Sequence, residues 1–73
     1  MKEKIIKVIN EVFEIDNANE QTSQKNCEQW DSLRHLNLIL SLEEEFHTSF
    51  EPEEIAMMKD YSSVETMIKK KIG

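Results

Sequence analysis

Glycine, proline and cysteine are nearly absent from the chain, which has one residue of each among 73. Turn-rich β-folds need more glycine and proline than this, so the composition disfavours a β-sandwich and indicates a helical domain. A single cysteine, Cys27, cannot form a disulfide within the chain, which fits a reducing compartment better than a secreted disulfide scaffold. We therefore expect one small helical domain over residues 1–73.

An apolar run long enough to cross a membrane is also missing. The apolar stretch near the N-terminus is interrupted by Lys7 and Asn10, so it fits neither a secretory signal nor a transmembrane helix. We expect the chain to lie in the cytoplasm, without membrane insertion. Basic residues are few, nine against fifteen acidic ones, and the formal net charge is −6. A phosphate backbone would repel such a chain, so nucleic acid is not an expected partner.

The chain is too short for a conventional active site. A domain of this size leaves about 40% of its unfolded-state surface exposed after folding, so a large catalytic cleft is not expected. An enzyme would have to recruit Asp31, Ser32 and His35, or Cys27 with a histidine, and nothing supplies an oxyanion hole. We expect no enzymatic activity.

A calcium loop can be aligned with the segment that starts at Asn17, but the alignment fails. The first position is Asn17 rather than aspartate, the sixth is Thr22 rather than glycine, and the ninth is Lys25. We therefore expect no metal site.

Two long amphipathic helices are predicted by the apolar pattern. In the first, from about residue 2 to residue 15, six apolar residues fall within an arc about 160° wide. The second is predicted from Ser32 to about His47, because Asp31 is a good N-cap and the strongest apolar run follows it. Residues 17–31 have no such pattern, so they predict a long loop whose end is packed against the core by Trp30.

Two further helices complete the expected fold. Pro52 suits the first position of a short third helix, since acidic residues follow it at the positive end of the dipole. Ser62 and Glu65 have the spacing of a capping box, which predicts the start of a fourth helix. The expected fold class is all-α: a four-helix bundle with three longer helices, a short third one, and a long loop between the first two.

Ser32 is the residue best placed to carry a chemical group. With Asp31 as the N-cap, Ser32 is the first residue of a helix, where backbone N–H groups lack acceptors and the dipole end is positive. A phosphate attached to the Ser32 oxygen is electrostatically favourable there. The preceding loop is long, and loops of this length in a compact domain are usually functional or disordered.

From residue 30 onward several motifs follow one another in order. They are Trp30-Asp31-Ser32-Leu33, Leu36, Ile39, Leu42-Glu43-Glu44-Glu45-Phe46, Phe50 and Pro52-Glu53-Glu54. This order resembles the acyl carrier proteins and the related peptidyl carrier domains, and the resemblance covers essentially the whole chain. It implies a bundle of the acyl-carrier type, with 4′-phosphopantetheine covalently attached to Ser32 by a phosphopantetheinyl transferase and Asp31 as the N-cap of the attachment motif. The terminal thiol of this arm would hold an acyl or aminoacyl group as a thioester and deliver it to partner enzymes.

The second helix also carries the predicted contacts with partner enzymes. Leu33 and Leu40 lie at the edge of its apolar arc, so they either form an apolar contact for partners or belong to the core. Glu43 and Glu44, with Glu45, would steer basic partners toward the chain. The resemblance implies a loading ligase and acyltransferases with basic docking patches as these partners, and a monomer suits a shuttle among them. The cargo could also be buried among the helices, against Leu38, Ile39, Leu42, Phe46, Met57 and Met58.

The residues after Leu33 depart from the usual pattern of the family. Arg34, His35 and Asn37 stand where carriers of fatty-acid synthesis commonly have acidic residues. The order Trp-Asp-Ser-Leu-x-His looks more like free-standing carriers of specialised pathways, such as polysaccharide modification, polyketide assembly or amino-acid activation. His35 falls inside the apolar arc, so we expect it to be half-buried and hydrogen-bonded near Trp30 or the loop.

The main alternative is a small acidic helical adaptor that binds a basic protein partner without a cofactor. An acidic run of the kind at Glu43 to Glu45 is most often only a solvated surface. The mass of the chain after exposure to coenzyme A and a transferase separates the two hypotheses.

Overall fold

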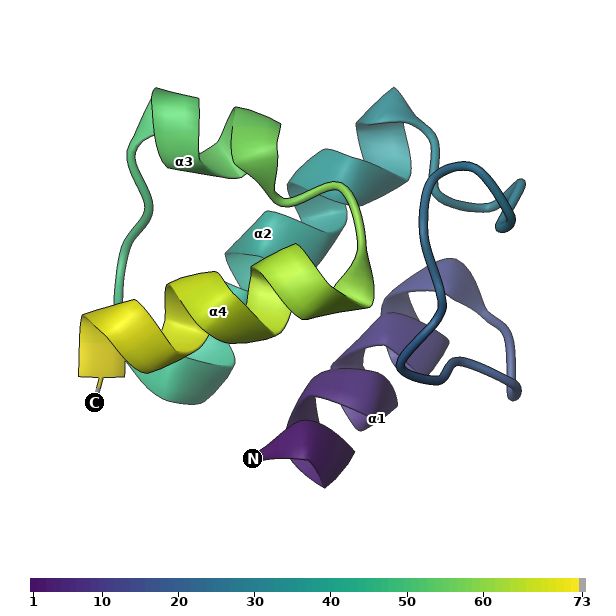
Figure 1. The fold of residues 1–73 in the computed structure, drawn as a ribbon, viewed down its shortest axis with the longest axis horizontal. Helices are drawn as coiled ribbons and strands as arrows, with labels where there is room; N and C mark the ends of the chain where they lie inside the picture. Colours follow the sequence, from purple (N-terminus) through teal and green to yellow (C-terminus); the bar gives the residue numbers. More distant parts are fainter. Residues whose placement is uncertain (73) are drawn as a thin grey trace.

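Helices make up most of the chain in the computed structural model, which describes residues 1–72. Over these residues there are four helices and no strand: α1 (Lys2–Phe13), α2 (Ser32–Phe46), α3 (Pro52–Met57) and α4 (Tyr61–Ile72). Figure 1 shows α4 crossing in front of α2, with α1 below them and α3 at the other end of the bundle. The expected all-α class, with a short third helix and a long first loop, is confirmed.

The first helix ends slightly earlier than the apolar pattern predicts. Glu14 takes a left-handed conformation, with φ 57°, and its backbone N–H donates to the carbonyl of Asn10. The N–H of Ile15 donates to the same carbonyl at 3.0 Å. This arrangement satisfies a carbonyl that the last turn of a helix otherwise leaves free, so α1 stops at Phe13.

The predicted capping box of the fourth helix is wrong. Ser62 lies inside the first turn of α4, which begins at Tyr61. The cap is Asp60: its carboxylate accepts from the backbone N–H of Ser63 at 2.8 Å, and its own N–H donates to the Ser63 hydroxyl at 3.2 Å. Glu65 instead accepts a hydrogen bond from the Tyr61 hydroxyl at 2.9 Å. Two overlapping capping patterns exist in the sequence, and the helix uses the one that starts at the earlier residue.

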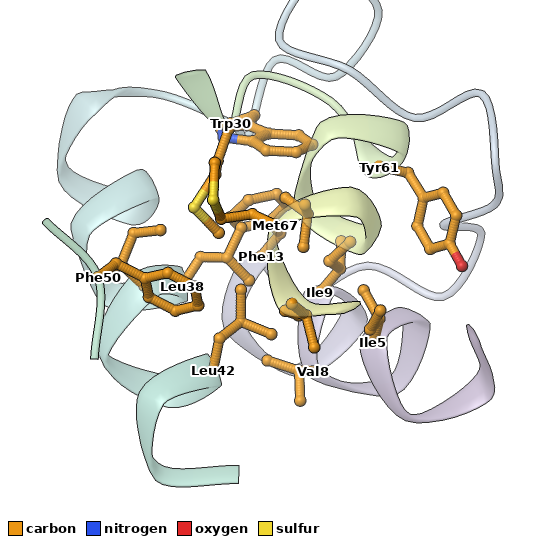
Figure 2. Close-up of a cluster of buried hydrophobic side chains, with 14 of the residues drawn as sticks. Ile5, Val8, Ile9, Phe13, Trp30, Leu38, Leu42, Phe50, Tyr61 and Met67 are labelled. Carbon is orange, nitrogen blue, oxygen red and sulfur yellow. The ribbon is translucent and has the colours of Figure 1, made fainter. Parts of the chain in front are cut away.

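The core is formed by side chains of α1, α2 and α4 that point toward one another (Figure 2). Trp30, at the end of the long loop, is only 3% exposed, and its ring lies 5.2 Å from that of Phe13 between centroids. The prediction that Trp30 packs the loop end against the core is confirmed. The other buried apolar residues are Ile5, Val8, Ile9, Cys27, Leu38, Ile39, Leu42, Phe50, Met58, Tyr61, Val64, Met67 and Ile68.

The long loop before α2 is held by its own polar side chains. Thr22 is buried, its hydroxyl accepts from the N–H of Asn19 at 2.8 Å, and its carbonyl accepts from the N–H of Tyr61 at 2.9 Å. The N–H of Gln24 donates to the carbonyl of Lys59 at 3.0 Å. These bonds attach the loop to the start of α4 and so fix the approach of the chain to Trp30. No helix within residues 1–72 combines the length and apolar character needed to span a bilayer.

Candidate modification site and docking surface

Ser32 is exposed and is the first residue of α2. Asp31 has extended backbone angles, φ −95° and ψ −179°, and its carboxylate accepts from the backbone N–H of Arg34 at 2.8 Å. The prediction of Asp31 as the N-cap is confirmed. The same carboxylate pairs with the Arg34 guanidinium at 3.0 Å. Within residues 1–72 the Ser32 hydroxyl makes no hydrogen bond to another side chain or to the backbone, and Ser32 is exposed at the surface.

The backbone around Ser32 leaves donors available for an anion. The N–H of Arg34 is used by the Asp31 carboxylate, and the N–H of His35 donates to the Asp31 carbonyl at 2.8 Å. The N–H groups of Ser32 and Leu33 lie before the first hydrogen bond of the helix and have no acceptor within it. A phosphate on the Ser32 oxygen would meet these two donors at the positive end of the α2 dipole.

The exposed leucines of α2 settle the alternative left open by the sequence. Leu33 is 70% exposed and Leu40 is 59% exposed, so both are surface residues rather than core. Leu36 is 54% exposed and lies on the same face, since residues 33, 36 and 40 recur at one-turn and two-turn spacing. The sequence analysis predicted no surface role for Leu36, although its helical spacing from Leu33 and Leu40 places it on the same face.

Met57 of α3 is also a surface residue, 61% exposed, so its suggested place in a buried cargo pocket is wrong. Of the other residues suggested for that pocket, Phe46 is partly buried and the remaining four are ordinary core: Leu38, Ile39, Leu42 and Met58. Two surface hollows of about 510 and 340 Å³ lie elsewhere, the first along the long loop and the second between α1 and the end of α2.

The acidic residues at the end of α2 differ in their contacts. The Glu43 carboxylate accepts from the backbone N–H of Phe50 at 2.9 Å, so this side chain holds the turn that leads to α3. Glu45 pairs with Lys4 of α1 at 3.5 Å. Glu44 is exposed and shares the α2 face of Leu33 and Leu40. Of the three glutamates, Glu44 is the one left for an outside partner.

His35 lies half-buried between the loop end and α3, as the sequence predicts. The indole Nε1 of Trp30 donates to its Nδ1 at 2.9 Å, and its Nε2 lies 2.9 Å from the carbonyl of Ile55. An indole N–H can only donate and a carbonyl can only accept. The two contacts together fit the tautomer that carries its hydrogen on Nε2, and the ring bridges Trp30 to α3.

No protein-family model matches the sequence, and no curated protein gives a significant match. Among residues 1–72 no group of three or more histidine, cysteine, aspartate or glutamate side chains is arranged to hold a metal ion. The arrangement at Ser32 instead combines a free hydroxyl, unpaired backbone donors and a neighbouring exposed apolar face.

Proposed function

We propose that the chain is an acyl or aminoacyl carrier protein whose Ser32 bears 4′-phosphopantetheine. The observation that carries the proposal is the accessible Ser32 hydroxyl at a helix N-terminus that Asp31 has already capped. A transferase would join the Ser32 oxygen to the phosphorus that bears the pantetheine and break the pyrophosphate of coenzyme A. The hydroxyl proton is lost, and the adenosine bisphosphate part leaves.

The residues around Ser32 fit a phosphodiester. The N–H groups of Ser32 and Leu33 can donate to its oxygens, and the helix dipole favours its negative charge. The Asp31 carboxylate would repel a phosphate, but the Arg34 guanidinium 3.0 Å from it offsets this charge. The arm supplies a thiol, on which the cargo is held as a thioester. The chain itself needs only to present the arm to each enzyme in turn.

Partner enzymes would bind the docking face, defined as the exposed side chains of Leu33, Leu36, Leu40 and Met57. A single exposed apolar side chain is common on protein surfaces and needs no function. Four large ones that are 54–70% exposed indicate a binding surface. The contact between His35 and Ile55 joins α3 to the first turns of α2, and Met57 is an exposed residue of α3. Glu44 borders this face and, with the net charge of −6, would attract enzymes with basic docking patches.

A carrier of this kind gains from weak binding. A tethered cargo has an effective concentration in the millimolar range at a docked enzyme, so a rapidly dissociating complex is sufficient. The partners would be a phosphopantetheinyl transferase, a loading ligase and acyltransferases. We propose that the carrier acts in the cytoplasm as a monomer, which suits a shuttle among several enzymes. We also propose that its pathway is a specialised one, because Arg34 and His35 stand where carriers of fatty-acid synthesis commonly have acidic residues.

The test is the intact mass of the chain after incubation with coenzyme A and a broad-specificity phosphopantetheinyl transferase. One added arm is expected on the wild-type chain and none on Ser32→Ala. Ser62→Ala is the matched control, because Ser62 is also exposed in the first turn of a helix capped by an aspartate. Retention of the bare mass by the wild-type chain would favour the adaptor hypothesis, in which the docking face binds a basic partner directly.

A further inference from the structure

α3 is attached to the bundle by few contacts. It has six residues, and none of them is buried. Its Glu54 carboxylate pairs with Lys71 of α4 at 2.7 Å, and its Ile55 carbonyl lies 2.9 Å from Nε2 of His35. The buried residues Phe50 and Met58 flank it on either side. A helix this short is not stable alone, so these contacts decide where it lies.

We propose that His35 is a positioning residue that holds α3, and with it Met57, beside the exposed leucines of α2, and that it does so only as a neutral imidazole. The consequence for partner enzymes rests on the proposed function, because it requires that Met57 and these leucines dock them. The protonation-dependent bridge from Trp30 through His35 to Ile55 does not need the proposed function, because it follows from the two hydrogen bonds of the ring.

The bridge needs the neutral ring because its two partners are of opposite kinds. Trp30 offers only a donor to Nδ1, and Ile55 offers only an acceptor to Nε2. Protonation places a hydrogen on Nδ1, so that two N–H groups face each other where a hydrogen bond existed. The indole is then left without its partner in a buried site, and the ring loses one of the two bonds that fix it.

The charged groups near this bridge lie on α2, on the loop before it and on α3. On α2, Asp31 and Arg34 pair with each other, and on the loop the nearest acid along the chain is Glu28. Within residues 1–72 no charged side chain lies within ion-pair distance of the imidazole.

On the α3 side, the carboxylates are Glu51, Glu53 and Glu54, and the cation is Lys71. The Glu54 carboxylate accepts from the Glu51 N–H and pairs with Lys71, and both contacts lower its pKa. The ion pair between α3 and α4 therefore persists from pH 8 to pH 5. A loss of α3 positioning in this interval would therefore not come from a loss of this ion pair.

The first experiment follows the protein itself by NMR between pH 8 and pH 5. Trp30 is the sole tryptophan, so its indole N–H gives one signal, and the Met57 methyl reports on α3. Both signals should shift with pH in the wild-type chain. They should also shift in His47→Gln, which removes the other histidine, exposed at the end of α2. In His35→Gln the shifts should vanish, because the amide can accept from Trp30 and donate to Ile55 at every pH.

The second experiment compares initial rates of arm transfer, each variant relative to wild type at the same pH. At pH 8 we expect His35→Gln to match wild type and His35→Leu, which removes both hydrogen bonds of the ring, to be slower by about tenfold or more. At pH 5.5 the His35→Gln chain should be faster than wild type, because a charged His35 ring loses its bond to Trp30 and the amide of glutamine does not.

The outcomes separate the two proposals. A wild-type chain that takes no arm at any pH would refute the carrier function. The NMR titration would still test the bridge from Trp30 through His35 to Ile55. A wild-type chain that takes the arm, with Trp30 and Met57 signals that titrate alike in wild type and His35→Gln, would overturn the role of His35 and leave the carrier function standing.

Discussion

The Glu43 carboxylate accepts a hydrogen bond from the backbone N–H of Phe50 at 2.9 Å, which ties the last turns of α2 to the segment before α3. Its neighbour Glu44 is exposed. Adjacent residues of one acidic run thus have different tasks: Glu43 stabilises the turn, and Glu44 is free to face a partner.

Replacement of Glu43 should therefore lower stability, and replacement of Glu44 should lower the rate of arm transfer. Glu43→Ala leaves the Phe50 N–H without its partner and should lower the free energy of unfolding by about 1–2 kcal/mol. Glu44→Ala should change it by less than about 0.5 kcal/mol. It should instead slow arm transfer at low salt, with the difference from wild type shrinking as salt screens the attraction. Urea unfolding and transfer rates measure the two effects, and equal losses of stability would contradict this division.

Leu36 and Leu38 provide a matched pair for the docking face. Leu36 is 54% exposed and Leu38 is 0% exposed, two positions apart on the same helix. Leu38→Ala should cost about 2–5 kcal/mol of stability because it opens a cavity in the core. Leu36→Ala should leave the unfolding midpoint nearly unchanged and still slow transfer by a partner enzyme. A Leu36→Ala chain that is modified at the wild-type rate would remove Leu36 from the docking face.

Acid should weaken the start of α4 through Asp60. Hydrogen bonds from the Ser63 N–H and hydroxyl lower the pKa of this carboxyl. The unfolded chain therefore binds the proton more readily, so the stabilisation is complete above the ordinary pKa of about 4 and is lost as the pH falls below it. Asp60→Ala should cost about 1 kcal/mol at pH 7, as for other N-caps, and less at pH 3.

Asp16→Ala is the control for this experiment, because Asp16 is exposed in the long connection after α1. Thermal unfolding followed by circular dichroism at both pH values gives the comparison. If the cost of Asp60→Ala were the same at pH 7 and pH 3, the carboxylate form would not be what caps α4.

High pH should destabilise the fold through Tyr61, the sole tyrosine of the chain. Burial raises the pKa of its phenol, and the hydrogen bond to Glu65 adds to this effect. The unfolded chain then loses the proton first, so the stabilisation is complete below the ordinary pKa of about 10 and decreases as the pH rises above it. Phenolate absorbance should appear together with the loss of helical signal. Tyr61→Phe should remove this alkaline loss, and a phenolate that forms near pH 10 in a folded chain would contradict the account.

The parts of the site that depend on neighbours in sequence could be predicted. Asp31 caps α2 and Ser32 is its first residue because the preference for an N-cap is local. The start of α4 could not be decided, since Asp60 with Ser63 and Ser62 with Glu65 both have capping spacing, and the structure uses Asp60.

Contacts between segments far apart in the sequence could not be predicted from the apolar pattern. His35 and Ile55 are twenty residues apart, and the bond joins a side chain to a backbone carbonyl, which any residue supplies. The exposure of Met57 likewise depends on how α3 lies on the bundle rather than on its own apolar character. Helical spacing alone left Leu33 and Leu40 undecided for the same reason.

The position of the added mass along the chain is the most direct test of the central claim. After incubation with coenzyme A and the transferase, fragmentation of the modified protein should place one phosphopantetheine on Ser32. Absence of any added mass, or an arm located on Ser62 or Cys27, would contradict the assignment of Ser32 as the attachment site of a carrier protein.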